Sequence, residues 1–201
     1  MKSTRRSVFS GVVAIMLLAL SFVLGYLTDM ALTEWDKHRY PTEFAEQVSA
    51  CAEQYDLDEY VIYALIKELS DFSSNRVSED GRIGLMQLSE ETFLWLTQEQ
   101  LRENLDAGLL YEPSTNIRYG CYYLLYLTTR YESWDLVFAA YLCGTNTVEG
   151  WLEDFARIQN ESETPMEFEI PDRITRRSVE KIQRTIDKYQ ELYQQKGDVT
   201  L

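Results

Sequence analysis

Carboxylates and aromatic rings are the side chains in this sequence whose chemistry could support catalysis. The 201-residue chain has 33 Asp and Glu, 14 Tyr and 4 Trp, but 1 His and 3 Cys. It contains no glycine-rich phosphate loop, dinucleotide fingerprint or serine-hydrolase elbow. A single His argues against a His-ligated metal site or a His-dependent triad. We therefore expect no metal and no cofactor, which leaves carboxylate chemistry.

Glu68 is the carboxylate whose surroundings best suit an acid catalyst. An acid that cleaves a glycosidic bond must be held protonated beside an apolar wall. Leu65, Leu69 and Phe72 flank Glu68 near the end of an apolar helical pattern. An acid on an amphipathic helix is also commonly part of the solvated edge of that helix, so both interpretations stay open. The Tyr and Trp residues likewise suit either sugar stacking or core packing.

The charge balance limits the classes of partner. The formal net charge is −14, whereas nucleic-acid binding needs a basic face, so we expect no nucleic-acid partner. Without residues 1–27 the chain keeps 16 basic and 33 acidic residues, a net charge of −17. A domain this acidic should be repelled by anionic lipid head groups and anionic wall polymers.

The N-terminus has the pattern of a membrane anchor. Lys2, Arg5 and Arg6 precede an uncharged run of 20 residues, 8–27. As a helix this run is about 30 Å long, enough to cross a bilayer core. The positive-inside rule predicts a cytoplasmic N-terminus at 1–7 and an extracytoplasmic remainder. A cleaved signal peptide is the alternative, but no A-x-A-like cleavage site follows the run.

The remainder of the chain predicts one all-α domain. We expect a polar juxtamembrane linker at 28–39, a compact domain at 40–195 and a short tail at 196–201. Apolar residues recur at helical spacing throughout this domain, and no segment alternates with period two for long. About 155 residues are enough to bury a sizeable core.

Several residues indicate where these helices begin and end. Asp58 and Ser89 are expected N-caps, and Gly144 is expected to end an apolar helix that begins near Trp134. Pro41 fits an early helical position. A helix is expected over 90–96.

Six short motifs carry a resemblance to a known family. Ala64–Phe72 followed by Val77–Ser78, Gly81 and Gly84–Gln87 resembles its signature A-x-I-x-x-E-S-x-F, V-S, G-x-x-G-L-M-Q. Residues 116–124 are similar to N-I-x-x-G-x-x-Y-L, 139–144 to A-A-Y-N-A-G, and 170–179 to I-P-x-x-E-T-x-x-Y-V. The family is that of the lytic transglycosylases (SLT domain, lysozyme-like superfamily), and the resemblance covers roughly residues 40–195.

The resemblance implies a fold, a substrate and a mechanism. It implies a lysozyme-like all-α domain that acts on peptidoglycan glycan strands. In the family, one Glu protonates the glycosidic oxygen between MurNAc and GlcNAc. The same Glu then helps the MurNAc 6-hydroxyl close onto the anomeric carbon, which gives a 1,6-anhydro product.

Four polar positions of the family pattern are changed in this chain. Aligned without a gap, the family Glu falls on Leu69 and the Asn of A-A-Y-N-A-G on Leu142, while the Glu and Tyr of the last motif fall on Ile174 and Ser178. Residues of family type are kept at these other motif positions, among others: Ser70, Gly84, Met86, Gln87, Asn116, Gly120, Tyr123, Tyr141 and Gly144. The resemblance assigns the substrate cleft to Ser70, Gln87, Tyr123, Tyr141, Leu142 and Ile174.

These changes predict a member of the family that lacks its catalytic acid. Leu69 can neither donate nor accept a proton. Glu68 is the fallback acid, but one residue along a helix turns a side chain by about 100°. Asp71 and Glu90 are further possible displaced acids.

Three of the replacements are aliphatic, and they would converge if the family fold holds. We expect Leu69, Leu142 and Ile174 either to fill the cleft as core or to form an apolar groove for an envelope protein. Glycan binding without cleavage through Gln87, Tyr123 and Tyr141 is the remaining alternative.

Overall fold

The computed structural model describes residues 2–162 and 164–194, and of residues 2–15 it describes the backbone alone. The expected tail, 196–201, lies outside this part. All regular elements within it are helices, which confirms the all-α prediction. They are α1 (Lys2–Arg39), α2 (Ala45–Tyr55), α3 (Glu59–Ser70), α4 (Glu90–Leu94), a π-helix η1 (Trp95–Gln100), a 3-10 helix η2 (Ala107–Tyr111), α5 (Pro113–Arg130), α6 (Trp134–Cys143), α7 (Thr145–Glu161) and α8 (Arg173–Tyr193).

The chain divides into two compact units, Met1–Pro41 and Thr42–Leu201. The first unit contains α1, which continues through the segment expected as a linker at 28–39. No Gly or Pro interrupts this segment before Pro41, so nothing in it breaks the helix. The expectation that Pro41 begins a helix is wrong. Pro41 follows the end of α1, because proline disfavours helical geometry at the residue before it, and α2 begins only at Ala45.

The expected helix boundaries of the second unit are largely confirmed. The Asp58 carboxylate accepts a hydrogen bond from the Tyr60 amide at 2.8 Å and caps α3. The Ser89 hydroxyl caps α4 through the Thr92 amide at 3.1 Å. Gly144 ends α6 with a φ of 87°, a left-handed value that glycine adopts without steric cost.

The core forms where α3 meets α8 and where α5 meets α2 and α6. All residues from Val61 to Ile66 of α3 are buried, as are Val179, Ile182 and Tyr189 of α8. The rings of Tyr63 and Tyr189 stack with their centroids 5.5 Å apart. Since α3 ends at Leu69 and Ser70, this packing fixes where the residues expected at the catalytic position lie.

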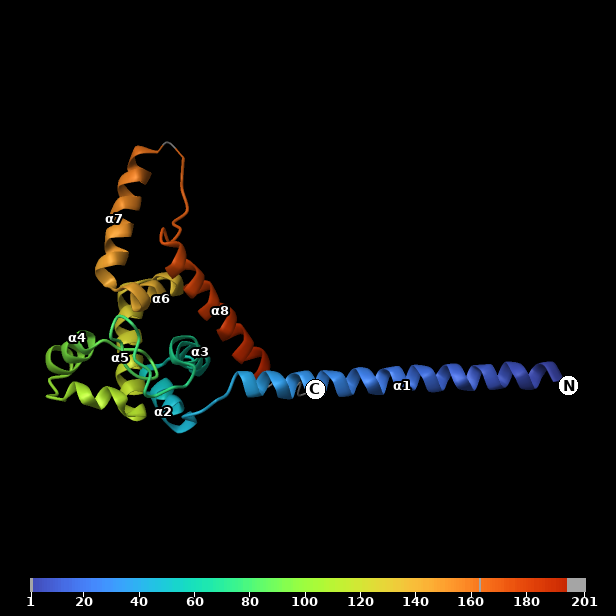
Figure 1. Cartoon of the computed structure of the whole chain (residues 1–201). Coiled ribbons are helices and arrows are strands. Elements are labelled where there is room, and N and C mark those ends of the chain that lie inside the picture. Colours follow the sequence, from blue (N-terminus) through green and yellow to red (C-terminus); the bar gives the residue numbers. More distant parts are fainter. Residues whose placement is uncertain (1, 163, 195–201) are drawn as a thin grey trace. The chain divides into compact units, whose positions relative to one another are not determined.

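Two segments differ from expectation around the later helices. The helix expected over 90–96 changes at Trp95 into the π-helix η1, a wider turn that often marks functional sites. Helix α7 and the extended segment after it project from the body before α8 returns (Figure 1). The edge-to-face contact of Phe155 and Phe168, with centroids 5.4 Å apart, links the two sides of this projection.

Candidate functional site

The loop between α3 and α4 forms the floor of the candidate site. Gln87 lies in this loop with a φ of 51° and is 4% exposed. Its side-chain amide donates hydrogen bonds to the carbonyl oxygens of Arg76 at 3.1 Å and Gly84 at 2.7 Å. The Gln87 amide therefore holds the loop together from within.

Asn116 of α5 ties this loop to the rest of the domain. Its side chain is fully buried, accepts a hydrogen bond from the Met86 amide at 2.7 Å and donates to the carbonyls of Ile83 and Leu110 at 2.9 and 2.8 Å. A Cβ atom on Gly84 would lie 2.2 Å from the Asn116 amide nitrogen, so only glycine fits at this position. Gly84 and Met86 of one motif thus contact Asn116 of another, and we call this contact the junction.

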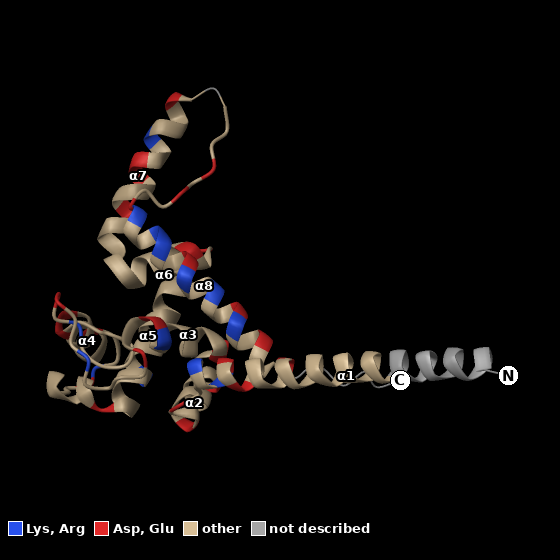
Figure 2. Cartoon of the chain, turned by 45° about the vertical axis from the view of Figure 1, so that its right-hand side comes forward, with Lys and Arg blue, Asp and Glu red and all other residues tan. Residues whose placement is uncertain are grey.

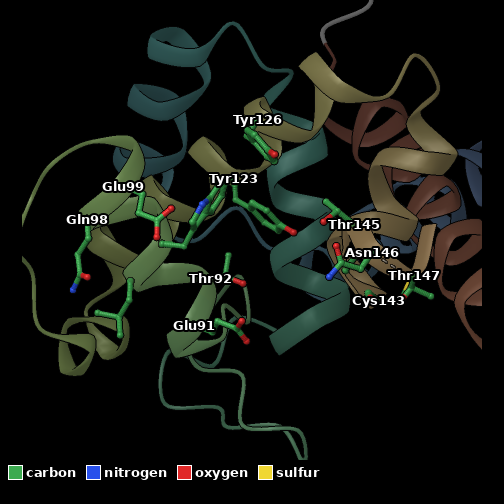
Figure 3. A pocket seen from close by; sticks show the side chains of 13 residues that line it. Glu91, Thr92, Gln98, Glu99, Tyr123, Tyr126, Cys143, Thr145, Asn146 and Thr147 are labelled. Atoms are coloured by element: carbon green, nitrogen blue, oxygen red, sulfur yellow. Dashed lines mark hydrogen bonds between the residues drawn. The ribbon is translucent and has the colours of Figure 1, made fainter. Parts of the chain in front are cut away.

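Two neighbouring hollows lie beside this loop, and the larger of them is an open groove of about 800 Å³. Its walls come from α4 and η1 on one side and from the start of α7 on the other, with α5 between them (Figure 3). The lining residues are Glu91, Thr92, Leu94, Trp95, Gln98, Glu99, Tyr123, Tyr126, Cys143, Gly144, Thr145, Asn146 and Thr147. Amide and hydroxyl groups beside aromatic rings are the combination with which proteins bind sugars, because rings stack on sugar faces and polar groups bond to hydroxyls.

Aromatic rings line the α5 side of this groove. The rings of Tyr123 and Tyr126 stack with centroids 6.4 Å apart, and Trp95 meets Tyr126 edge to face at 4.9 Å. Burial raises the pKa of Tyr123 to about 12. Its hydroxyl therefore stays neutral at physiological pH and serves as a hydrogen-bonding group.

A smaller hollow of about 170 Å³ adjoins the groove and shares Thr92, Tyr123 and Gly144 with it. Tyr141 lines this hollow, where its hydroxyl donates to the Met86 carbonyl at 2.9 Å and burial raises its pKa well above the usual value. The Tyr141 hydroxyl is thus a scaffold bond to the floor loop.

Arg82 also lines the smaller hollow, and the sequence did not single it out. Its guanidinium donates to the carbonyl oxygens of Tyr141, at 3.1 Å, and Leu142 at the end of α6. It also pairs with Asp80 at 2.8 Å. Arg82 therefore occupies the carbonyl end of α6, beside the position where the family pattern has Asn.

Leu69 and Glu68 lie side by side in the last turn of α3 but in different surroundings. Leu69 is partly buried and lines neither of the two hollows just described. The Glu68 side chain is 11% exposed, and its carboxylate faces α8. There it accepts a hydrogen bond from the Thr185 hydroxyl at 2.7 Å and pairs with Lys181.

The other expected cleft residues differ in their exposure to solvent. Ile174 is 74% exposed at the start of α8, whereas Leu142 is partly buried. The Ser70 side chain is buried, and its hydroxyl donates to the Ile66 carbonyl at 2.9 Å within α3. Of the six residues assigned to the cleft, Gln87, Tyr123 and Tyr141 line the smaller hollow together. The exposure of Ile174 argues against a shared groove with Leu69 and Leu142.

The groove contains residues that the sequence pattern could not assign. The sequence left Trp95 and Tyr126, like the other Tyr and Trp residues, open between sugar stacking and core packing. The polar residues 145–147 follow the A-A-Y-N-A-G motif and belong to no motif of the family. Only the turn of η1 and the approach of α7 to α5 bring these side chains to one groove.

In the described part of the chain, no three His, Cys, Asp or Glu side chains are close enough to hold a metal ion.

The chain belongs to the Transglycosylase SLT domain family, whose model matches residues 46–163. Among solved structures it is similar to an inactive mutant of lytic transglycosylase Slt from Pseudomonas aeruginosa, in which a glutamate is replaced by glutamine. The identity is 27% and the TM-score 0.64, over 78% of this chain and 25% of that one. The lysozyme-like fold expected from the motifs is confirmed.

The fold also matches the 70-kDa soluble lytic transglycosylase Slt70 from Escherichia coli. This chain shares 21% identity with it at a TM-score of 0.65, again over 78% of this chain and 25% of that one. A complex of the 70-kDa enzyme with bulgecin A matches equally well. The chain therefore spans about a quarter of the length of these structural relatives.

One helix in the described part is long and apolar enough to cross a membrane. It is the Met16–Arg39 portion of α1, near the N-terminus, which has the length and composition of a membrane span. An N-terminal signal sequence has the same properties. The helix is thus a candidate for either an anchor or a signal.

Proposed function

We propose that this chain is a membrane-anchored, extracytoplasmic SLT-domain protein that associates with peptidoglycan glycan strands without cleaving them. Its N-terminal helix serves as the anchor, and its groove beside Tyr123 and Tyr126 receives glycan. The observation that carries the proposal is the surroundings of Glu68. Its carboxylate is held by Thr185 and Lys181 of α8, while the position of the family acid is Leu69.

The loss of the acid removes the central step of the family mechanism. That step needs one group to protonate the glycosidic oxygen and then to accept the proton of the MurNAc 6-hydroxyl. A positioned acid or base is typically worth on the order of 10²–10⁴-fold in rate, and one residue performs both tasks in the family. Leu69 can perform neither, so cleavage through the family mechanism stops at its first proton transfer.

The preserved scaffold supports a binding role. The floor loop keeps its bonds to Asn116 and Tyr141, and the groove of about 800 Å³ remains open beside it. Glu91 and Glu99 are the carboxylates that line this groove, and both side chains are exposed. An acid that protonates a glycosidic oxygen must lie beside an apolar wall, so we assign these two residues to solvated positions of the rim.

The alternative is an active lytic transglycosylase with a displaced acid such as Glu68. For that role the Glu68 side chain must leave Thr185 and turn from α8 toward the cleft. Such a movement would leave the buried Thr185 hydroxyl without its acceptor, which costs about 1–3 kcal/mol. The bonds of Glu68 therefore favour a structural role for its carboxylate.

Purified sacculi provide the test. The full chain is incubated with sacculi, and soluble 1,6-anhydro muropeptides and sacculus-bound protein are measured in parallel with an active lytic transglycosylase. We expect bound protein and no release above the buffer blank. Robust release would refute the loss of catalysis, and absence from the sacculus pellet would refute glycan binding. If release occurs, a Glu68→Gln variant shows whether Glu68 is the displaced acid.

A further inference from the structure

Helix α8 begins with a dense cluster of basic residues in an otherwise acidic domain. Residues 42–194 contain 13 basic and 29 acidic residues, a net charge of −16. Five of the 13 basic residues lie within residues 173–184, which contain one acidic residue. Lys and Arg recur along α8 in Figure 2, whereas the other helices of the domain carry few of them. The charge of the domain is therefore strongly asymmetric.

The basic residues occupy the solvent face of α8. Arg173, Arg177, Lys181 and Arg184 follow at intervals of four, four and three residues, which places them along one side of a helix. All four are exposed, with side-chain exposures of 65% for Lys181 and 67% for Arg184. The opposite side of the helix packs into the core through residues such as Val179 and Ile182. We call these four cations the basic stripe.

Folding alone gives little reason for these cations at the start of α8. The N-terminal end of a helix carries a partial positive charge, which disfavours cations there. Asp172 caps the helix by accepting a hydrogen bond from the Thr175 amide, and the first turn itself contains no acidic residue. Within the described part of the chain Arg173 and Arg177 form no salt bridge. Ile174 projects from the same turn and is 74% exposed. An exposed aliphatic side chain beside arginines can enter the head-group boundary of a membrane while the arginines pair with lipid phosphates.

We propose that the first half of α8 docks on the anionic phospholipid surface of the membrane that holds α1. In the docked state the basic stripe contacts lipid phosphates, and Ile174 enters the boundary between head groups and acyl chains. This inference rests on the anchoring role proposed for α1 above.

The chain length keeps the domain near such a surface. The 14 residues from 28 to 41 separate the expected span from the domain. Even fully extended they reach only about 50 Å, so the domain is held at high effective concentration beside the bilayer. At physiological salt, interactions between charges are screened beyond about 8 Å. The lipid phosphates therefore interact mainly with the basic stripe beside them and little with acidic residues farther away. The acidic remainder of the domain is repelled, which favours the orientation with α8 toward the lipid.

Hydrogen–deuterium exchange of the full chain in nanodiscs tests this inference. One set of nanodiscs contains phosphatidylglycerol and phosphatidylcholine, and the other contains phosphatidylcholine alone. We expect exchange in peptides covering residues 172–178 to be at least threefold slower with phosphatidylglycerol, and this protection to disappear in high salt. Protection of residues 8–27 in both lipids reports separately that α1 is embedded.

Two matched double variants identify the residues responsible. Arg173→Gln/Arg177→Gln removes two charges of the basic stripe, and we expect about a fivefold loss of the docked population per arginine. Arg102→Gln/Arg157→Gln makes the same charge change at exposed sites outside α8 and should leave the protection intact. Both variants replace exposed side chains, so folding of the domain should be unaffected.

Three results would overturn the inference. One is equal exchange of residues 172–178 in both lipids. Another is that the Arg102→Gln/Arg157→Gln variant also loses protection, which would indicate that docking depends on the net charge of the domain and not on the basic stripe. The third is protection that appears on addition of sacculi but not with phosphatidylglycerol, which would assign the stripe to an anionic wall polymer. If residues 8–27 exchange freely in both lipids, α1 is not embedded in the membrane. That result refutes the proposed anchoring, and it is distinct from a failure of α8 to dock.

Discussion

The contact between Glu68 and α8 leads to a quantitative prediction about stability. We consider Glu68→Ala and Glu68→Gln in a fragment of residues 42–201, the compact unit that contains the core. The Thr185 residue is 4% exposed, and its hydroxyl donates to Glu68 at 2.7 Å. Truncation to alanine leaves this buried donor without an acceptor, which costs about 1–3 kcal/mol.

The ion pair adds less to this cost. Lys181 is 65% exposed, and exposed pairs contribute about 0–1 kcal/mol. We therefore expect Glu68→Ala to lower the free energy of unfolding by about 2–3 kcal/mol. Glutamine retains an acceptor oxygen for Thr185, so Glu68→Gln should cost about 1 kcal/mol or less. In a domain of this size these losses correspond to Tm decreases of about 4–12 °C and 0–4 °C.

Thermal unfolding followed by far-UV circular dichroism measures both variants. Glu180→Ala is the matched control, because Glu180 is a 52% exposed helical acid whose pair with Arg184 spans 3.7 Å. It should change the Tm little. If Glu68→Ala has as small an effect as this control, the carboxylate does not anchor α3 to α8, and the structural role argued for Glu68 is refuted.

Three further predictions concern the floor, the groove and an acid-sensitive cluster. Asn116→Ala removes three hydrogen bonds, two of them buried and one partly buried, and should cost about 3–5 kcal/mol in urea unfolding. A loss below about 1 kcal/mol would contradict the junction described. Trp95→Ala should weaken sacculus binding about 3–10-fold in a sedimentation assay, whereas Trp134→Ala, outside the groove, should not. The hydroxyl of Tyr119 and the Arg118 guanidinium hold the pKa of Glu103 below its usual 4.5. Its contribution to stability is therefore fully present above about pH 4.5 and lost as the pH falls through the lower pKa of the folded state, so Glu103→Gln should make the acid limb of a Tm–pH profile shallower.

Local sequence signals predicted the helices well where the physical cause is local. Asp58, Ser89 and Gly144 act on the backbone within a few residues, and all three lie at the boundaries expected of them. Pro41 failed as a helix start because proline suits either the first turn of a helix or the segment after one. The helix at 90–96 became a π-helix from Trp95, which helical periodicity does not distinguish from an α-helix.

The amino-acid sequence by itself determined the family, and it predicts that the catalytic acid of the family is missing. Motif spacing identified the SLT domain, and a leucine at position 69 has no ionisable proton in any conformation. Only the tertiary structure decided where the remaining polar groups act. The Glu68 carboxylate meets Thr185 at a separation of 117 residues, and Arg82 reaches the end of α6 across 60 residues. Such contacts depend on the packing angles of whole helices, which no local pattern encodes.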